Sequence, residues 1–142
     1  MKEHRDTIGY KNCNPLNIRY SSRNNWRGQI GENKGFCVFS HEAWGFRAAY
    51  KLITNYISQG YNTIEKIVSR WAPPTENDTE AYIKYVAYET IIDRDTILTD
   101  CNIHDYWTKL IIIRTMARME SFREIDEQQI NLYINYPEKY DK

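Results

Sequence analysis

The chain has 142 residues, and its 19 Lys and Arg residues balance 19 Asp and Glu residues, so the formal net charge is zero. A protein that binds nucleic acid by neutralising phosphates normally carries a basic excess or a basic stripe, and none is visible here. With 42% hydrophobic and 27% charged residues, the composition is that of a globular protein whose length suits one core. We therefore expect a single domain over residues 1–142 that does not bind nucleic acid.

The sequence carries no signal for a membrane, a leader or a bound cofactor. It has no run of about 18 apolar residues, and the start Met1–Asp6 lacks an apolar stretch. We expect the protein to be cytoplasmic when synthesised, without a signal peptide or membrane insertion. Cys13, Cys37 and Cys101 are scattered and the histidines lack a metal-binding spacing, so we expect reduced thiols and no metal. Nucleotide-binding glycine motifs and the GxSxG motif are absent, so no cofactor is expected.

The segment from about residue 9 to 40 predicts a small β-rich lobe. Turn-forming Asn, Gly and Pro residues surround two short runs of β type, Asn17–Tyr20 and Phe36–Phe39. We expect these runs to form a hairpin or an irregular β structure near the N-terminus.

The remainder, about residues 41–136, has helical periodicity. The expected N-caps, in chain order, are Ser40, Asn62 or Thr63, Asp78 and Asp126. A long helix is expected from about Ile103 to Glu120, and the last helix should end at Pro137. The expected fold class is therefore mainly α (α+β), with at least five helices and one hairpin.

Glu120 is a candidate for acid–base chemistry because it breaks the pattern of its helix. On a helical wheel it falls between Ile113 and Met116, on the apolar face and in the last turn. Burial and the negative end of the helix dipole both disfavour a charged carboxylate there, so its pKa should be raised, as a general acid requires. In the alternative interpretation, Glu120 emerges into water or pairs with Arg123 or Arg47.

Two polar segments suggest a surface that binds sugars. The first is Asn14-Pro15-Leu16-Asn17-Ile18-Arg19, followed by Trp26-Arg27-Gly28; amides and a guanidinium suit hydroxyl groups, and an indole suits a sugar face. The second is the corner Arg70–Tyr82, where two prolines separate two helices and hold out Glu76 and Asn77. In the alternative interpretation, Asn14-Pro15 forms a turn, Trp26 closes the core of the hairpin, and Asp78 or Thr79 caps a helix. We expect Trp26, Asn17 and Trp71 to surround one concavity.

These segments resemble a family of small phage and prophage proteins that are often labelled virion structural proteins. The resemblance spans roughly residues 8 to 120 and is most specific at Trp71-Ala72-Pro73-Pro74. Where that family commonly reads Asn-Pro-Gly-Asn, this chain has Leu16. More distantly, the segments are similar to the lysozyme-like superfamily, in its glucosaminidase and lytic transglycosylase branch.

That superfamily places a catalytic Glu-Ser pair at the end of an apolar helix, before an Asn-x-x-x-Ile-Lys/Arg strand and a Trp-x-Gly turn. Here the pair is Glu120-Ser121, and it follows the strand motif in sequence, so we infer a circular permutation. Glu3 is the unpermuted alternative, but no apolar helix surrounds it.

The resemblance implies cleavage of the β-1,4 bonds of peptidoglycan glycan strands by a lysozyme-like helical domain. Glu120 would protonate the leaving oxygen, with Glu76, Glu42 and Glu32 as candidates for a second carboxylate. The residues implied to contact the substrate are Asn14, Asn17, Arg19, Trp26, Gly28, Trp71, Asn77 and Tyr82. Such an enzyme would act at the cell wall or in the virion, once delivered.

Two other classes of function stay open. The chain could be a non-catalytic virion component or glycan-binding module, or an adaptor that contacts other virion or secretion-apparatus proteins. Its 12 Tyr, 4 Trp and 4 Phe residues suit a groove or an interface, because most of these rings carry a polar group.

Overall fold

The computed structural model describes residues 3–142 and is mainly α-helical, with one two-stranded antiparallel sheet near the N-terminus. This confirms the predicted fold class. In chain order the elements are η1 (His4–Asp6), α1 (Ile8–Lys11), β1 (Gln29–Asn33), β2 (Phe36–Phe39), α2 (Glu42–Ser58), α3 (Ile64–Trp71), α4 (Thr79–Thr90), α5 (Ile103–Ser121), α6 (Glu127–Asn135) and α7 (Pro137–Tyr140).

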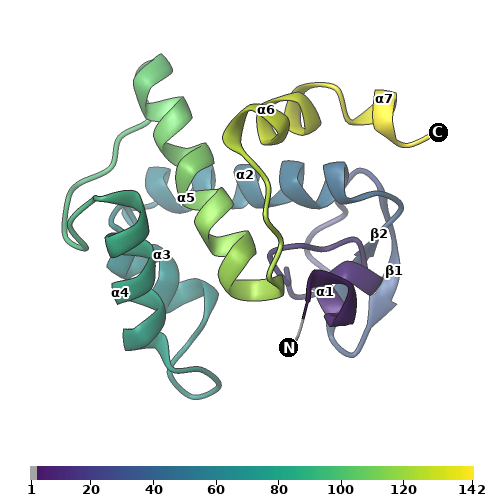
Figure 1. Cartoon of the computed structure of the whole chain (residues 1–142), viewed down its shortest axis with the longest axis horizontal. Coiled ribbons are helices and arrows are strands. Elements are labelled where there is room, and N and C mark those ends of the chain that lie inside the picture. Colours follow the sequence, from purple (N-terminus) through teal and green to yellow (C-terminus); the bar gives the residue numbers. More distant parts are fainter. Residues whose placement is uncertain (1–2) are drawn as a thin grey trace.

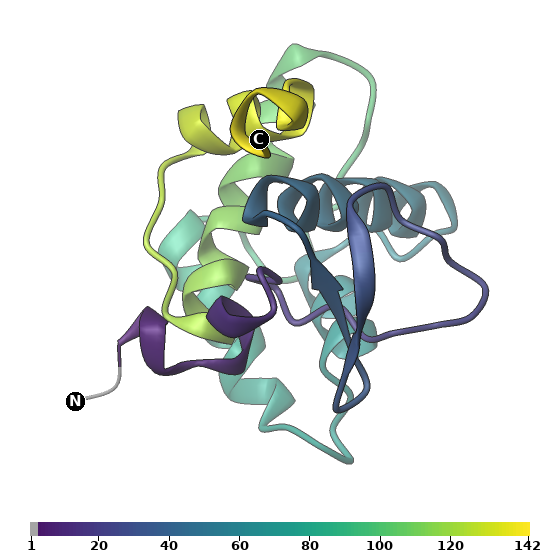
Figure 2. The ribbon, with the colours of Figure 1, turned by 90° about the vertical axis from the view of Figure 1, so that its right-hand side faces the viewer.

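The long helix α5 runs through the middle of the molecule, and α2 crosses it (Figure 1). Helix α4 packs against one side of α5 and pairs with α3, while α6 packs against both α5 and α2. The hairpin lies at the opposite end of the longest axis from α4, and Figure 2 shows it standing beside α2. The short helix α1 packs against the C-terminal end of α5. The N-terminal segment of the described chain therefore lies beside residue 121.

Side-chain caps fix the beginnings of the helices. Thr63, Asp78, Asn102 and Asp126 each accept a hydrogen bond from a backbone N–H in the first turn of α3, α4, α5 and α6, as their residue types favour. The predicted cap Ser40 is wrong. His41 caps α2 instead, where its Nδ1 accepts from the backbone N–H of Ala43 at 3.0 Å.

The predicted strand Asn17–Tyr20 is also wrong, because it forms only an isolated bridge between Arg19 and Phe36. Asn17 has a φ of +52°, which is incompatible with a strand. The true partner of Phe36–Phe39 is β1, which is joined to it by the tight turn Lys34-Gly35, where both residues have positive φ. Positive φ at both central residues is typical of the turn that matches strand twist in a hairpin.

Buried apolar side chains from every region of the chain form one hydrophobic cluster. The cluster includes Leu16 and Phe39 of the lobe, Phe46 of α2 and Ile113 of α5, all at most 1% exposed. The lobe is therefore packed onto the helices through shared apolar contacts and does not stand apart from them.

Candidate functional site

The C-terminal end of α5 is held by the N-terminal part of the chain. Helix α5 ends at Ser121, and its C-cap residue, Phe122, has a φ of +56°. The Ser121 hydroxyl is buried and donates to the carbonyl of Pro15 at 2.8 Å. The Ser121 carbonyl lies 2.8 Å from His4 Nδ1, and since a carbonyl only accepts, this ring nitrogen is the protonated one. The Asn17 amide donates to the carbonyl of Glu120 at 3.0 Å.

These contacts place the Glu120 side chain against two donors from distant segments. Asn17 Nδ2 donates to Glu120 Oε1 at 3.2 Å, and the Tyr82 hydroxyl donates to Oε2 at 3.0 Å. Tyr82 itself is buried, and its burial and the neighbouring carboxylate raise its pKa well above the usual value. Glu120 is thus oriented from both sides by groups that stay neutral near pH 7.

Burial raises the pKa of Glu120 above its usual value, and the hydrogen bonds from Asn17 and Tyr82 and the charge of Arg19 only partly oppose this. The direction agrees with the sequence-based expectation. A raised pKa is the direction that a general acid requires. The alternative partners are wrong: Arg123 binds Glu42 instead, and the guanidinium of Arg47 lies over the ring of Trp44.

Asn17 combines two unusual features. Its φ of +52° is in the left-handed region, and its Oδ1 atom is buried without a hydrogen-bond partner within residues 3–142. Asn tolerates this backbone conformation better than most residues. Strained backbone and unsatisfied buried polar atoms are both more frequent at functional sites. The residue that orients Glu120 therefore combines a left-handed backbone with an unsatisfied buried polar atom.

A cavity of about 160 Å³ opens beside Asn17. It is lined by Asn17, Ile18, Arg19, Asn24, Leu52, Tyr56, Arg70 and Trp71. The Trp71 indole donates to the carbonyl of Leu16 at 2.9 Å and packs edge-to-face on Tyr56. The Arg70 guanidinium lies over the rings of Tyr56 and Tyr61. The wall thus combines aromatic rings, guanidinium groups and amides, which is the chemistry that a sugar chain requires.

Three of the expected contact residues, Asn17, Arg19 and Trp71, line this cavity, whereas Glu120 and Trp26 are not among its lining residues. Trp26 is half-buried against the core, and its indole nitrogen has no partner within residues 3–142. The predicted concavity around Asn17, Trp26 and Trp71 therefore holds for two of its three members. Arg70 belongs to the corner Arg70–Tyr82 that the sequence singled out, but no feature of the sequence indicated that Tyr56 would join them.

Asn14 and Gly28 have structural roles. The Asn14 side chain is fully buried and its amide bonds the backbone of Ile18 and Cys37. A Cβ on Gly28 would lie 2.0 Å from the Trp44 ring. A ligand could not reach Asn14 in this arrangement. Asn77 is exposed and donates to the carbonyl of Pro73, outside the cavity.

The other candidate carboxylates take part in local interactions. Glu42 accepts two hydrogen bonds from Arg123, at 2.7 and 2.6 Å, and one from Tyr133 at 3.0 Å. Although burial opposes the change, these partners lower the pKa of Glu42, so it is a poor proton donor. Glu76 forms a half-exposed ion pair with Arg19 at 2.7 Å.

Glu32 and Glu3 complete the set of candidates. Glu32 accepts from the backbone N–H of Gly35 in the hairpin turn, and Glu3 is exposed beside Arg5. Neither side chain contacts the end of α5, so Glu120 is the best-placed candidate acid.

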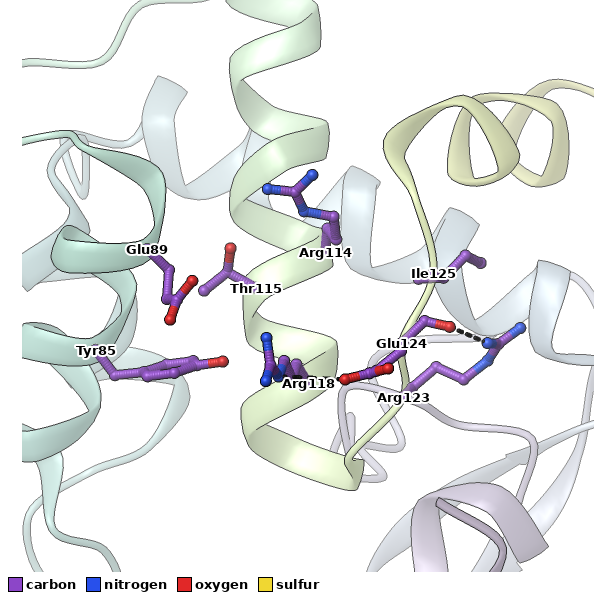
Figure 3. Close-up of a pocket in the computed structure, with 8 residues that line it drawn as sticks. All are labelled: Tyr85, Glu89, Arg114, Thr115, Arg118, Arg123, Glu124 and Ile125. Atoms are coloured by element: carbon purple, nitrogen blue, oxygen red, sulfur yellow. Dashed lines mark hydrogen bonds and ion pairs between the residues drawn. The ribbon is translucent and has the colours of Figure 1, made fainter. Parts of the chain in front are cut away.

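A second cavity, of about 290 Å³, lies on the outer side of α5 between α4 and residues 123–125 (Figure 3). Arg114, Arg118 and Arg123 reach it, but each guanidinium has a carboxylate partner, at Glu127, Glu124 and Glu42 respectively. The guanidinium charges are thus already neutralised by carboxylates of the same chain. A surface balanced in this way gives no reason to assign an anion site.

The described part of the chain contains neither a metal-binding cluster nor a membrane-spanning helix. Within residues 3–142, no group of three or more His, Cys, Asp or Glu side chains is arranged to hold a metal ion. None of the helices there has both the length and the apolar character that crossing a bilayer requires. The three cysteines are free thiols.

Comparison with known proteins places the chain close to a phage protein. It is similar to Protein P5 of Pseudoalteromonas phage PM2, with 39% identity over 97 residues that make up 65% of this chain and 61% of that protein. The match thus spans about three fifths of the relative's length. No protein-family model matches the chain. The similarity supports the expectation of a phage-type protein, while cleavage of peptidoglycan remains a proposal.

Proposed function

We propose that the protein cleaves the glycan strands of peptidoglycan, with Glu120 as the general acid. The observation that carries this proposal is the Glu120 carboxyl itself: it is shielded at the end of α5, oriented by Asn17 and Tyr82, and has a raised pKa. A purely structural carboxylate is normally paired with a cation, as Glu42 is with Arg123. The relation to a phage protein is compatible with action on a bacterial wall.

In the proposed reaction, Glu120 gives its proton to the glycosidic oxygen as the bond between that oxygen and the anomeric carbon breaks. The carbonyl oxygen of the substrate's own N-acetyl group supports the positive charge that develops at the anomeric carbon. Water or a sugar hydroxyl then attacks this carbon and returns a proton to Glu120. We assign no second protein carboxylate, because Glu42 and Glu76 are engaged by Arg123 and Arg19.

Tyr82 and Asn17 would adjust the pKa of Glu120 without contacting the scissile glycosidic bond. Their hydrogen bonds favour the charged form of Glu120 and so limit how far burial raises its pKa. Trp71, Arg19 and Tyr56 would bind the sugars on one side of the scissile bond, in the cavity beside Asn17.

The test uses purified sacculi and measures released soluble muropeptides and their reducing ends. Glu120→Gln keeps the shape of the side chain but removes the transferable proton, so release should fall by at least the ~10²-fold typical of general acid catalysis. Glu89→Gln is the matched control, because Glu89 is exposed and makes no ion pair within residues 3–142. Unchanged release by Glu120→Gln would refute the assignment.

A second candidate function is a non-catalytic phage component that binds glycan. The observation that favours it is the engagement of Glu42 and Glu76 in ion pairs, which leaves Glu120 without a free carboxylate partner. Sedimentation with sacculi but no release of muropeptides by the wild-type protein would support this function over the first.

A further inference from the structure

The loop between α4 and α5 carries an unusual exposed apolar patch. Its large apolar side chains and exposed fractions are Tyr88 81%, Ile91 92%, Ile97 62% and Ile103 70%. Tyr88 and Ile91 line one hollow and Ile97 lines a second, and Ile92 belongs to the lining of both; Ile103 lies at the start of α5. Single exposed apolar residues are common, whereas a group of this kind marks an interaction surface. We name these four residues and Ile92 the loop patch.

Ile91 is also strained. It has a φ of +57° at the C-cap of α4, where Gly or Asn is the usual residue. The left-handed conformation is unfavourable for a β-branched residue, and the side chain gains nothing from packing because it is almost fully exposed. Neither packing nor the Glu120 site explains this residue, because Ile91 follows the end of α4, whereas Tyr82, which contacts Glu120, lies near the start of that helix.

The loop patch lies in an acidic part of the chain. Residues 87–105 contain five acidic residues and one basic residue, Arg94, and one of the five, Asp100, is paired with Lys109. Arg94 is itself paired with Glu65 and Glu80. Glu89, Asp93 and Asp95 make no ion pair within residues 3–142. A partner for this surface should therefore combine apolar side chains with Lys or Arg.

The hairpin lobe of the same chain has this complementary chemistry. Residues 19–34 contain four basic residues and one acidic residue. Arg19 and Arg27 are already paired with Glu76 and Glu138. Arg23 and Lys34 are exposed and make no ion pair within the described residues 3–142. Ile30 is 68% exposed, as the extra residue of an irregularity between Gln29 and Gly31 in the ladder. Such a bulge turns a side chain outward from a sheet edge.

The two surfaces lie at opposite ends of the longest axis (Figure 1). We infer that the loop patch of one copy binds the hairpin lobe of a second copy, so that molecules associate head to tail. Because each copy keeps one free surface, the contact is heterologous and extends beyond a dimer unless the rotation closes a ring. This inference does not depend on the proposed catalytic function.

Sedimentation velocity from micromolar to millimolar concentration tests the inference. The wild-type sedimentation coefficient should rise with concentration, and less so at about 300 mM than at about 50 mM salt, because salt screens the attraction. Ile91→Asn combined with Asp93→Lys should weaken association at least tenfold, and so should Ile30→Glu. Phe122→Asn is the matched control, because Phe122 is another exposed apolar residue with a left-handed φ, outside both surfaces.

An equal mixture of the loop-patch variant and the Ile30→Glu variant gives the sharpest result. Each variant keeps one intact surface, so the mixture should form dimers and nothing larger. Wild-type protein that stays monomeric throughout, association that survives Ile30→Glu, a mixture without dimers, or equal loss in Phe122→Asn would each overturn the inference.

Discussion

Glu120 and Glu42 are both shielded carboxylates, yet we expect replacement by Gln to change the free energy of unfolding in opposite directions. Glu42 accepts three hydrogen bonds, two of them from the Arg123 guanidinium, and the two side chains are only 20% and 23% exposed. Glu120 accepts two hydrogen bonds, both from neutral groups, the Asn17 amide and the Tyr82 hydroxyl. The partners of Glu42 stabilise its charged form, whereas burial of Glu120 destabilises its charged form more than its two hydrogen bonds stabilise it.

Hydrogen bonds to charged groups contribute about 1.5–3 kcal/mol each, and Gln keeps one acceptor, so Glu42→Gln should cost about 2 kcal/mol at pH 7. Glu120→Gln loses little, because its new amide can donate to the Tyr82 oxygen, and it removes the cost of a buried charge. We expect it to be as stable as the wild type or up to about 1 kcal/mol more stable. The two variants should thus differ by roughly 2–3 kcal/mol.

The pH dependence separates the two effects. The pKa of Glu120 is raised, so the protonated wild type is favoured at low pH and this advantage is lost as pH rises through the folded-state pKa. The pKa of Glu42 is lowered, so its contribution is present above the unfolded pKa and is lost as pH falls through the folded-state value. At pH values below the unfolded-state pKa, Glu120→Gln should match the wild type, and it should become the more stable of the two as pH rises through the folded-state pKa of Glu120. Glu42→Gln should be most destabilised at pH values above the unfolded-state pKa.

Urea unfolding of both variants at several pH values measures this directly, because a change of about 2 kcal/mol moves the midpoint by roughly 1 M. A Glu120→Gln variant that is more than about 1 kcal/mol less stable than wild type at pH 7 would refute the claim that burial dominates at this carboxyl.

Three further predictions concern neighbouring features. Tyr82→Phe removes a bond that favours charged Glu120, so the pH at which muropeptide release declines should rise; an unshifted profile would contradict the positioning role. Asn14→Ala removes the partner of the Ile18 N–H and should cost about 3 kcal/mol in urea unfolding; less than about 1 kcal/mol would show that water replaces it. Gly28→Ala brings a Cβ within 2.0 Å of Trp44 at a φ of +79° and should lower the thermal midpoint by at least several degrees, as calorimetry would detect, corresponding to about 2 kcal/mol.

The helices were predictable because their signals are local. Thr63, Asp78 and Asp126 cap the helices that they were expected to begin, and α5 starts at the predicted Ile103. The short helices α1 and α7 were missed, since four residues are too few to show a helical period. The strand at residues 17–20 was wrong because the buried Asn14 amide holds this segment from inside, an interaction that β propensity does not reveal.

The candidate site was only partly predictable. The wheel position of Glu120 indicated its burial, and the resemblance to lysozyme-like enzymes suggested that Asn17 and Trp71 were relevant. The pairing of Glu42 with Arg123 joins residues 81 positions apart, and no local pattern encodes it. Which carboxylate is neutralised and which is left without a cation is decided by tertiary packing.

The contacts at the end of α5 also determine when during synthesis the site can exist. Glu120 and Ser121 bind Asn17, Pro15 and His4 across separations of 103, 106 and 117 residues. Protein synthesis proceeds from the N-terminus, so the donors from Asn17 and His4 are made long before the helix end that they hold. A growing chain that has passed residue 71 but has not yet reached residue 120 contains all residues that line the cavity but not Glu120. The contacts around Glu120 can therefore form only after most of the chain has been translated. Contacts of such long range also form slowly.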